Sequence, residues 1–295
     1  MKEDIDPYFG LLDKRKLEEE NADLKRLIGE FLLALKTAAT KGDTYCQYYL
    51  GQLYETGDIA SLAGVKEVSQ DEKEALKWYR RAAQQGHADS QKSLGLCLID
   101  GRGTRQNAAQ GFKLLKRVAG QGLADGQFFL AQAYSKGWGV KPDPAKAAVW
   151  FRKAADQGHS FALGLLAAMY EQGRGVTQNY KEALKLYRKA AAKKHPDSLY
   201  RLGEFYRLGL ATKQDYTKAK KWYEEAAKHG VCGSELSAGL RLAEMYVQGL
   251  GVKQDFSEAR KLYAEVVRRC EMFYRKQSYA LQILDWAKEA LNKLK

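Results

Sequence analysis

The sequence predicts an all-α fold, an α-solenoid of about six helix-turn-helix repeats, and three recurring columns of residues support that prediction. Paired small residues close the predicted second helices at intervals of 36 residues, with a last interval of 40: Ala82-Ala83, Val118-Ala119, Ala154-Ala155, Ala190-Ala191, Ala226-Ala227 and Val266-Val267. A column seven residues before each pair reads Ala75, Gly111, Ala147, Ala183, Ala219 and Ala259. The predicted first helices share the leucines Leu50, Leu94, Leu130, Leu166, Leu202 and Leu242. A fixed period of this length is typical of solenoids, in which each hairpin buries its apolar face against its neighbours.

The segment 160–195 shows how one period forms a helical hairpin. Its first half carries apolar residues at the three-and-four spacing of an amphipathic helix. Gly173 and Gly175 predict a turn. Asn179 is expected to cap the second helix, with Glu182 three residues later as the other half of a capping box.

The repeat boundaries divide the chain into three parts. We expect an N-terminal arm and capping half-repeat over residues 1–41, six repeats over 42–270 and a C-terminal capping helix over 271–295. The six repeats are predicted at 42–87, 88–123, 124–159, 160–195, 196–231 and 232–270. Although 295 residues would ordinarily suggest about two domains, a repeat array needs no central core, so we expect one elongated body.

Terminal and irregular repeats carry further expectations. Two apolar sets are expected to be buried at the ends of the array: Leu24, Leu27, Ile28 and Leu32 under repeat 1, and Leu281, Ile283, Leu284, Trp286, Ala287 and Leu291 in the last helix. The surplus within Ile59–Gln70 is expected to form a surface loop, with a dedicated partner-binding loop as the alternative. Repeat 5 reads Gly209-Leu210-Ala211 without the usual second glycine, so its turn is expected to differ.

These residues resemble the Sel1-like repeat (SLR) family, a relative of the tetratricopeptide repeat. Trp138-Gly139-Val140 followed by Trp150-Phe151 and Ala154-Ala155 is a good match, and the resemblance covers roughly residues 30 to 270. It implies a right-handed α-solenoid that binds proteins or peptides. In bacteria such proteins often serve as adaptors, secretion-system components or immunity proteins that neutralise a toxin, while the fold itself says nearly nothing of the partner.

The sequence offers no catalytic or metal-binding motif. His87, His159 and His195 share one repeat position just past the end of the second helix, where interactions with the helix dipole and the last carbonyls explain them. No Cys-x-x-Cys or His-Glu-x-x-His spacing occurs. We therefore expect no enzyme, no metal and no cofactor. A hydrolase whose site no motif reveals is the alternative, and a His-containing or carboxylate-rich cleft would favour it.

The net charge of +13 has two interpretations. Most lysines and arginines belong to the second helices of the repeats, which is typical of a solvated outer face. The alternative is attraction to an acidic protein partner, which would mainly speed encounter. Nucleic acid is a more distant third, because no known reader motif accompanies the charge.

Two features bear on the compartment. No apolar run approaches the roughly twenty residues that a membrane span needs, and MKEDIDPYFG has no signal core. The expected localisation is cytoplasmic, or periplasmic if a leader was removed. Cys46 and Cys97 are expected to pack as small hydrophobes, whereas Cys232 and Cys270 bracket repeat 6 and are a possible disulfide, which would indicate an oxidising compartment.

The predicted binding surface is the concave wall formed by the first helices. In a tetratricopeptide-like register, the second, fifth, ninth and twelfth places of each first helix turn away from the core. The candidate partner-binding residues at these places are Tyr45, Tyr48, Lys92, Leu96, Ile99, Phe128, Gln132, Phe161, Tyr200, Glu204, Arg207, Leu240 and Glu244. Aromatic anchors dominate interface energetics, so this wall predicts a non-catalytic scaffold that binds a protein or peptide. Lys92 and Arg207 are expected to orient an acidic partner, and a register error that places some of these residues in the core is the alternative.

Overall fold

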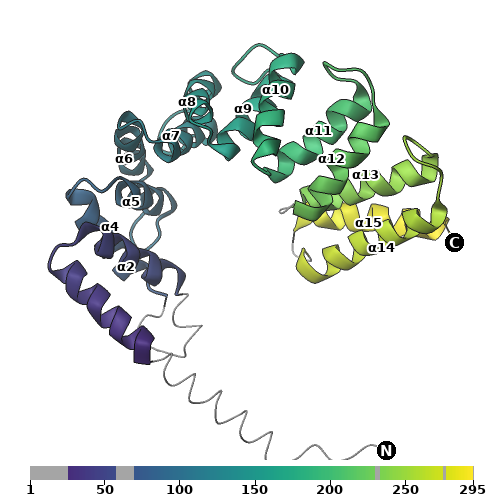
Figure 1. Ribbon diagram of the computed structural model, residues 1–295. Coiled ribbons are helices and arrows are strands. Elements are labelled where there is room, and N and C mark those ends of the chain that lie inside the picture. The colour runs from purple at the N-terminus through teal and green to yellow at the C-terminus, as the bar shows by residue number, and fades with distance from the viewer. Residues whose placement is uncertain (1–25, 58–69, 230–232, 275–276, 295) are drawn as a thin grey trace, which may run out of the picture. The chain divides into compact units, whose positions relative to one another are not determined.

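The computed structural model describes residues 26–57, 70–229, 233–274 and 277–294, and all of its regular structure in those ranges is helical (Figure 1). Its contacts divide the chain into two compact units, Met1–Pro142 and Asp143–Lys295, here called the N-terminal and C-terminal units. Each is described by itself. The expectation of one elongated body stays a prediction.

Two kinds of helix alternate along the chain, as the repeat pattern predicts. The first helices of the six repeats are α2 (Thr44–Thr56), α5 (Ala88–Asp100), α7 (Ala124–Lys136), α9 (Ser160–Gln172), α11 (Pro196–Leu208) and α13 (Ser234–Gln248). The second helices are α4 (Glu72–Gln84), α6 (Ala108–Gly120), α8 (Pro144–Asp156), α10 (Tyr180–Ala192), α12 (Tyr216–His229) and α14 (Phe256–Phe273), and α15 (Ser278–Lys293) follows. Consecutive helices pack together within each unit, so the chain is an all-α solenoid of Sel1-like hairpins.

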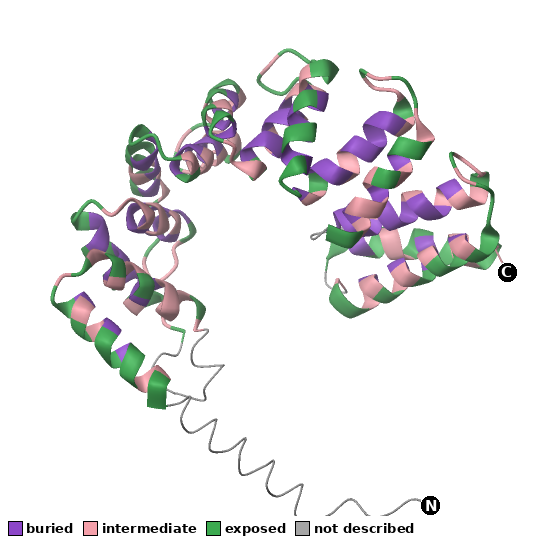
Figure 2. Ribbon diagram, in the orientation of Figure 1, coloured by how far each residue is buried: buried purple, intermediate pink, exposed green. Residues whose placement is uncertain are grey.

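Within each unit, buried residues lie on the helix faces that meet neighbouring helices, and exposed residues lie on the faces turned away from them (Figure 2). The repeat columns supply most of this core. Tyr79, Phe151, Tyr187 and Tyr223 from the second helices are among the largest fully buried side chains. The leucines of the first helices, such as Leu50 and Leu166, are equally buried. The columns therefore mark the seams along which neighbouring helices pack.

Each second helix begins at an Asp or Asn whose side chain accepts a backbone hydrogen bond. Asn179 accepts from the N–H of Glu182 at 3.0 Å, as predicted. The other half of the predicted capping box is wrong, because the backbone N–H of Asn179 instead donates to the carbonyl of Tyr170 at 2.8 Å. The corresponding bonds join Asp215 to Tyr206 and Asp255 to Tyr246, so this N–H closes the hairpin and leaves no donor for Glu182.

The turns between paired helices need a left-handed backbone at two positions. Gly173 ends α9 with φ +69° and Gly175 follows with φ +71°. A Cβ on Gly175 would lie 2.4 Å from the carbonyl oxygen of Pro144, at the start of the preceding second helix. In repeat 5, Ala211 takes the same left-handed conformation with φ +53°, so the expectation that this turn differs is wrong. Ala211 thus adopts a backbone conformation that alanine disfavours.

The described residues 26–40 form a helix that packs on repeat 1 through Leu32, Leu35 and Ala39. The side-chain amide of Gln47 donates to the carbonyl of Ala39 at 2.9 Å, just as Gln91 donates to Ala83 in the next repeat at 3.1 Å. This helix thus takes the place of a second helix, as expected of a half-repeat. The expectation for Leu27 is wrong because its side chain is exposed; Ile28 is partly buried, and Leu24 lies outside the described residues.

The last helix buries a narrower stripe than the sequence suggests. Ala280 and Ala287 are buried, while Ile283, Leu284 and Leu291 are partly buried against the same cluster. Leu281 and Trp286 are exposed, so their predicted burial is wrong. The physical reason is that small alanines form the contact seam, which lets α15 approach α14 closely and leaves the larger side chains at its edges.

Two sequence expectations fall on residues that the structure does not describe. Residues 59–69 of the insertion within Ile59–Gln70 lie outside the described residues, so the structure does not test the expected loop. Cys232 also lies outside them, while Cys270 carries a free, buried thiol. The described part of the chain thus gives the possible Cys232–Cys270 disulfide no support, and the bond stays a prediction. Cys97 is buried and Cys46 partly buried.

Candidate binding groove

The predicted binding residues of the N-terminal unit form an aromatic cluster on α2. Tyr45 is 68% exposed, and its ring lies edge-on to the ring of His87 with centroids 5.1 Å apart. Tyr48 is half-buried beside the same histidine, with centroids 5.0 Å apart. Leu96, Phe128 and Gln132 are also half-buried. Ile99 is only 4% exposed and belongs to a core cluster, so its assignment to the binding surface is wrong.

The same aromatic–histidine contact recurs in the C-terminal unit. Phe161 is exposed, and its ring lies edge-on to that of His195 with centroids 5.0 Å apart. His195 is the N-cap of α11, where its Nδ1 accepts a hydrogen bond from the backbone N–H of Ser198 at 3.3 Å. His87 and His159 cap α5 and α9 in the same way. The expected bond to the preceding helix's last carbonyls is made by the backbone N–H of each histidine, which donates to Ala82, Ala154 and Ala190 respectively. The side chains, by contrast, are acceptors for the following helix.

The charged residues expected to orient a partner are instead paired within the protein. Lys92 Nζ lies 2.9 Å from Asp89 and 3.0 Å from Asp125. Arg207 Nη2 lies 2.8 Å from the carboxylate of Glu204. Both cations already have carboxylate partners, so the expectation that they hold an acidic partner is wrong.

Glu204 is the centre of a buried network. Its carboxylate accepts a hydrogen bond from Tyr223 and ion pairs from Arg207 and, at 3.2 Å, Arg241. Burial opposes the charged form of Glu204, but these donors together hold the pKa of its carboxyl below the usual value. Arg241 also pairs with Glu244 at 2.8 Å. Glu204 therefore stabilises the stacking of repeats 5 and 6 and is too buried for the partner contact predicted for it.

The C-terminal unit carries a hollow of about 430 Å³ on the side of its first helices. Its walls come from four elements: Gly164 and Leu165 on α9, Asp197, Ser198, Tyr200 and Arg201 on α11, Ser237 on α13, and Gln282 and Ile283 on α15. Tyr187 from α10 and His195 also line it, as do Ala168, Gly233 and Ser234. A concave site of this size is within the range of ordinary ligand pockets.

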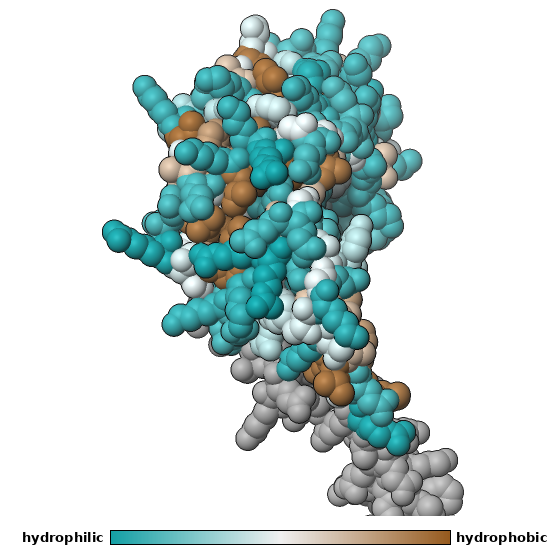
Figure 3. Space-filling model, turned by 90° about the vertical axis from the view of Figure 1, so that its left-hand side faces the viewer, coloured by the Kyte–Doolittle hydropathy of each residue, from teal (hydrophilic) through white to brown (hydrophobic). Residues whose placement is uncertain are grey.

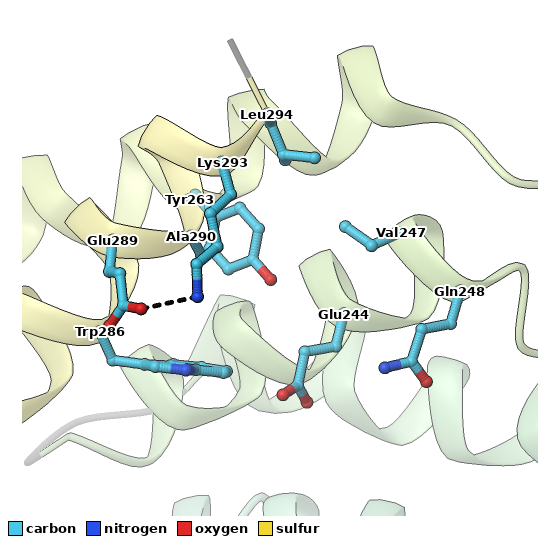
Figure 4. Close-up of a pocket in the computed structure, with 9 residues that line it drawn as sticks. All are labelled: Glu244, Val247, Gln248, Tyr263, Trp286, Glu289, Ala290, Lys293 and Leu294. Carbon is cyan, nitrogen blue, oxygen red and sulfur yellow. Dashed lines mark hydrogen bonds and ion pairs between the residues drawn. The ribbon is translucent and has the colours of Figure 1, made fainter.

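Two smaller hollows continue from this one. Tyr200 and Ser237 also line a hollow of about 290 Å³ with Leu240, Arg241 and Trp286. Trp286 is in turn shared with a third, of about 220 Å³, between α13, α14 and α15 (Figure 4). Each hollow thus shares wall residues with the next, and the three together are here called the binding groove, whose walls include Tyr200 and Trp286. Leu240 is only 7% exposed and forms part of the floor, so it offers little surface of its own.

Some groove residues were missed by the sequence reasoning. Asp197 and Ser237 stand at the second place of their helices, but the search singled out aromatic residues there. Leu165, Arg201 and Arg241 stand at the sixth place, which the register left out. Trp286 was assigned to the buried stripe of the capping helix. A reading of the whole second and sixth columns would have found all of these except Trp286, which lies outside the repeats.

Outside the groove, apolar patches, metal-binding groups and membrane-spanning helices are the other features that could indicate a function. On the face shown in Figure 3, hydrophilic side chains cover most of the surface and apolar ones form small, separate patches. Among the described residues, no group of His, Cys, Asp and Glu is arranged to hold a metal ion. A helix both long and apolar enough to cross a membrane is likewise not found in the described ranges.

The fold and groove define an α-solenoid repeat protein. The Sel1 repeat profile matches six segments of the chain, residues 44–87, 88–123, 124–159, 160–195, 196–231 and 237–265. The chain therefore belongs to the Sel1 repeat family, whose members are protein-interaction scaffolds.

Solved structures show the same fold. A protective antigen present in uropathogenic Escherichia coli strains, with an SLR fold, is 31% identical with a TM-score of 0.71; the match covers 89% of this chain and 56% of the antigen. A Sel1 repeat protein from Oxalobacter formigenes is 29% identical with a TM-score of 0.71, over 85% of this chain and 98% of that protein. An immunity protein from Pseudomonas aeruginosa is 17% identical with a TM-score of 0.45, over 83% of this chain and 81% of that one, and this likeness carries no functional argument. A search of curated proteins gives no match.

Proposed function

We propose that the protein is a non-catalytic scaffold that holds a segment of a partner protein in the binding groove of its C-terminal unit. The observation that carries this proposal is the continuity of the three hollows through Tyr200, Ser237 and Trp286. A run of hollows along several helices suits an extended or helical segment better than a compact small molecule. Membership of a family of interaction scaffolds supports the same conclusion.

The groove has the composition of a contact surface. Trp286 is 37% exposed, and its ring lies perpendicular to that of Tyr263 with centroids 6.2 Å apart. Tyr200 packs its ring near that of Tyr223, with centroids 5.9 Å apart. Both groove aromatics are thus held in place before binding, which lowers the entropy cost of association. Rigid aromatic residues in a pocket are the usual energetic centres of interfaces.

A hydrolase is the alternative function, and the pair of His195 and Ser198 in the groove is its candidate catalytic site. The Nδ1 of His195 lies 2.9 Å from the Ser198 hydroxyl, and burial lowers the pKa of the imidazole. The same pair recurs as His87 and Ser90 at 2.9 Å in the N-terminal unit, where the histidine also caps a helix. A contact that recurs at the same repeat position is a feature of the helix cap. We therefore favour the scaffold.

The test is co-purification from the source cell with a matched pair of variants. Trp286→Ser and Tyr200→Ser, combined in one chain, remove the two groove aromatics. Tyr180→Ser is the control, because Tyr180 on α10 is also 37% exposed but does not line the groove. The proposal expects a protein that co-purifies with the wild type and the control but is lost from the double variant at unchanged helical content. A partner retained equally by all three proteins would overturn it.

The proposal extends to the biological role of the scaffold, as an adaptor or as an immunity protein. The family resemblance implies a bacterial adaptor or an immunity protein, and the identity of the captured protein tests which one applies. A secreted toxin that the protein inhibits would support the immunity role. A partner whose activity the protein leaves unchanged would support the adaptor role.

A further inference from the structure

The third hollow of the groove combines apolar walls with polar groups at its edges (Figure 4). Val247, Ala290 and Leu294 form the apolar walls, and the flat indole of Trp286 lies across one side. Its volume of about 220 Å³ is smaller than that of ordinary small-molecule pockets. It therefore has the size expected for one side chain of a bound segment. We call it the Trp286 pocket.

Tyr263 places an unsatisfied hydroxyl in this pocket. The residue is only 3% exposed, and Figure 4 shows its hydroxyl directed into the hollow. Three tyrosines at the equivalent repeat position, Tyr79, Tyr187 and Tyr223, each donate to a glutamate. Tyr263 makes no hydrogen bond within the described residues. The hydroxyl oxygen is not one of the buried polar atoms left without a partner, so it is accessible from the hollow, and a ligand group that enters the hollow can bond to it.

The reason for this difference is visible in the sequence. Tyr79 and Tyr187 bond to Glu55 and Glu171, which stand five residues after the repeat leucines Leu50 and Leu166. The equivalent residue in repeat 6 is Val247, which has no acceptor. Glu244 stands at the position of Glu204, the acceptor that Tyr223 uses, but it pairs with Arg241 and makes no hydrogen bond to Tyr263. The hydroxyl that other repeats use to join their helices is therefore left facing the pocket.

Charges of both signs border the pocket. Glu244 and Glu289 are the lining carboxylates and Lys293 is the lining cation, while Arg241 pairs with Glu244 and Arg260 donates to the carbonyl of Leu294. Lys293 pairs with Glu289 at 2.6 Å, but both side chains are highly exposed, so the pair is weak. Glu244 pairs with Arg241 through Oε2, and its Oε1 makes no hydrogen bond within the described residues. Burial, with a smaller contribution from the charge of Glu244, raises the pKa of Tyr263 to about 12.

We infer that the Trp286 pocket binds the positively charged side chain of an arginine or lysine of the partner protein. The aliphatic stem packs between Val247 and Leu294. The charged head lies against the face of the indole, a favourable cation–π arrangement. It donates hydrogen bonds to Oε1 of Glu244 and to the hydroxyl oxygen of Tyr263. This inference rests on the proposed function, and it names a chemistry opposite to the acidic partner that the net charge suggests.

The test uses small probes, so it does not depend on a partner. N-acetyl-arginine amide carries the proposed side chain, N-acetyl-citrulline amide is its neutral isostere, and N-acetyl-glutamate amide carries the opposite charge. The readout is the indole N–H signal of Trp286 in a ¹H–¹⁵N NMR spectrum of the full chain. The chain has five tryptophans, and the signal is assigned from the Trp286→Phe variant.

The expected result is a saturable shift of the Trp286 signal with the arginine probe, at least about tenfold stronger in affinity than with citrulline, since a charge-assisted hydrogen bond is lost. A shift that does not saturate, equal affinity for citrulline, or tighter binding of the glutamate probe would each overturn the inference. If the double variant loses the partner but the arginine probe does not bind, the inference of a basic side chain is overturned and the proposed function stands. Arginine binding without any partner capture would instead contradict the proposed function.

Variants of opposite sign sharpen the test. Glu244→Gln is expected to weaken arginine binding about tenfold, and Lys293→Gln to strengthen it a few-fold because a competing cation is removed. Tyr263→Phe is expected to weaken it a few-fold. Tyr79→Phe removes the equivalent hydroxyl in the N-terminal unit, which does not line the pocket, and is expected to leave arginine binding unchanged. Weaker binding in Lys293→Gln would contradict the inferred charge of the ligand.

Discussion

The hydroxyl of Tyr223 donates a hydrogen bond to the carboxylate of Glu204, whereas the hydroxyl of Tyr263, at the same position one repeat later, has no partner within the described residues. One column of tyrosines thus serves two purposes. In repeat 5 the hydroxyl holds the second helix against the first. In repeat 6 it faces the groove.

This difference predicts unequal costs of removing the two hydroxyls. Tyr223→Phe is expected to lower the free energy of unfolding by about 1.5–3 kcal/mol, because a buried carboxylate loses a donor. Tyr263→Phe is expected to change it by less than about 0.5 kcal/mol. Urea unfolding followed by circular dichroism measures both values. Equal losses would show that Tyr263 has a structural partner.

The turn of repeat 5 predicts a stabilising substitution. Ala211 has φ +53°, a conformation that costs a non-glycine residue about 1–2 kcal/mol. Ala211→Gly removes that cost but makes the unfolded chain more flexible, so a net gain of about 0.5–1 kcal/mol is expected. Thermal unfolding measures the gain.

The matched control for that substitution is Gly175→Ala. It is the reverse exchange, glycine to alanine, at the equivalent turn of repeat 4. Its Cβ would meet the carbonyl of Pro144 at 2.4 Å, so it is expected to destabilise by more than Ala211→Gly stabilises. A loss of stability in Ala211→Gly would mean that the alanine methyl makes a packing contact worth more than the strain.

The caps predict a dependence of stability on pH. Burial lowers the pKa of His195 below 6.5, the effect of His159 acts in the same direction, and Asp197 opposes them. Because the unfolded chain then binds the proton more readily than the folded one, neutral His195 contributes to the free energy of unfolding above pH 6.5. This contribution is lost as the pH falls through the lower pKa that His195 has in the folded protein.

His195→Asn isolates this contribution, since asparagine is a good N-cap that does not titrate. Wild type is expected to lose more unfolding free energy than the variant between pH 7.5 and 5. Urea titrations at the two pH values measure the difference. Identical losses would show that the cap does not depend on the protonation of His195.

Most of the fold follows from the repeat columns, because each column marks a contact that recurs in every repeat. The leucines, alanines and tyrosines that align at fixed intervals are the residues that lie buried between helices. The histidines illustrate what a column cannot resolve. His195 follows one helix and precedes the next, and only the geometry shows that its Nδ1 faces the second.

The groove was predictable only in part. Tyr200 and Glu244 were found from the helix register, since both belong to repeating positions. Trp286 was not, because α15 follows the repeats and its orientation depends on how Ala280 and Ala287 pack. The pairing of Lys92 with Asp125 of the next repeat also depends on the spacing between repeats, which sequence alone does not provide. Arg207 pairs with Glu204 three residues earlier in its own helix, a spacing that the sequence does show.

The most direct measurement of the central claim is site-specific photo-cross-linking in the source cell. A benzophenone amino acid replaces Trp286 in one protein and Tyr180 in another, two positions of equal exposure on different surfaces. The account predicts one discrete cross-linked protein from position 286 and none of it from position 180. Cross-linking of the same protein from position 180, with none from position 286, would contradict the groove as the binding site.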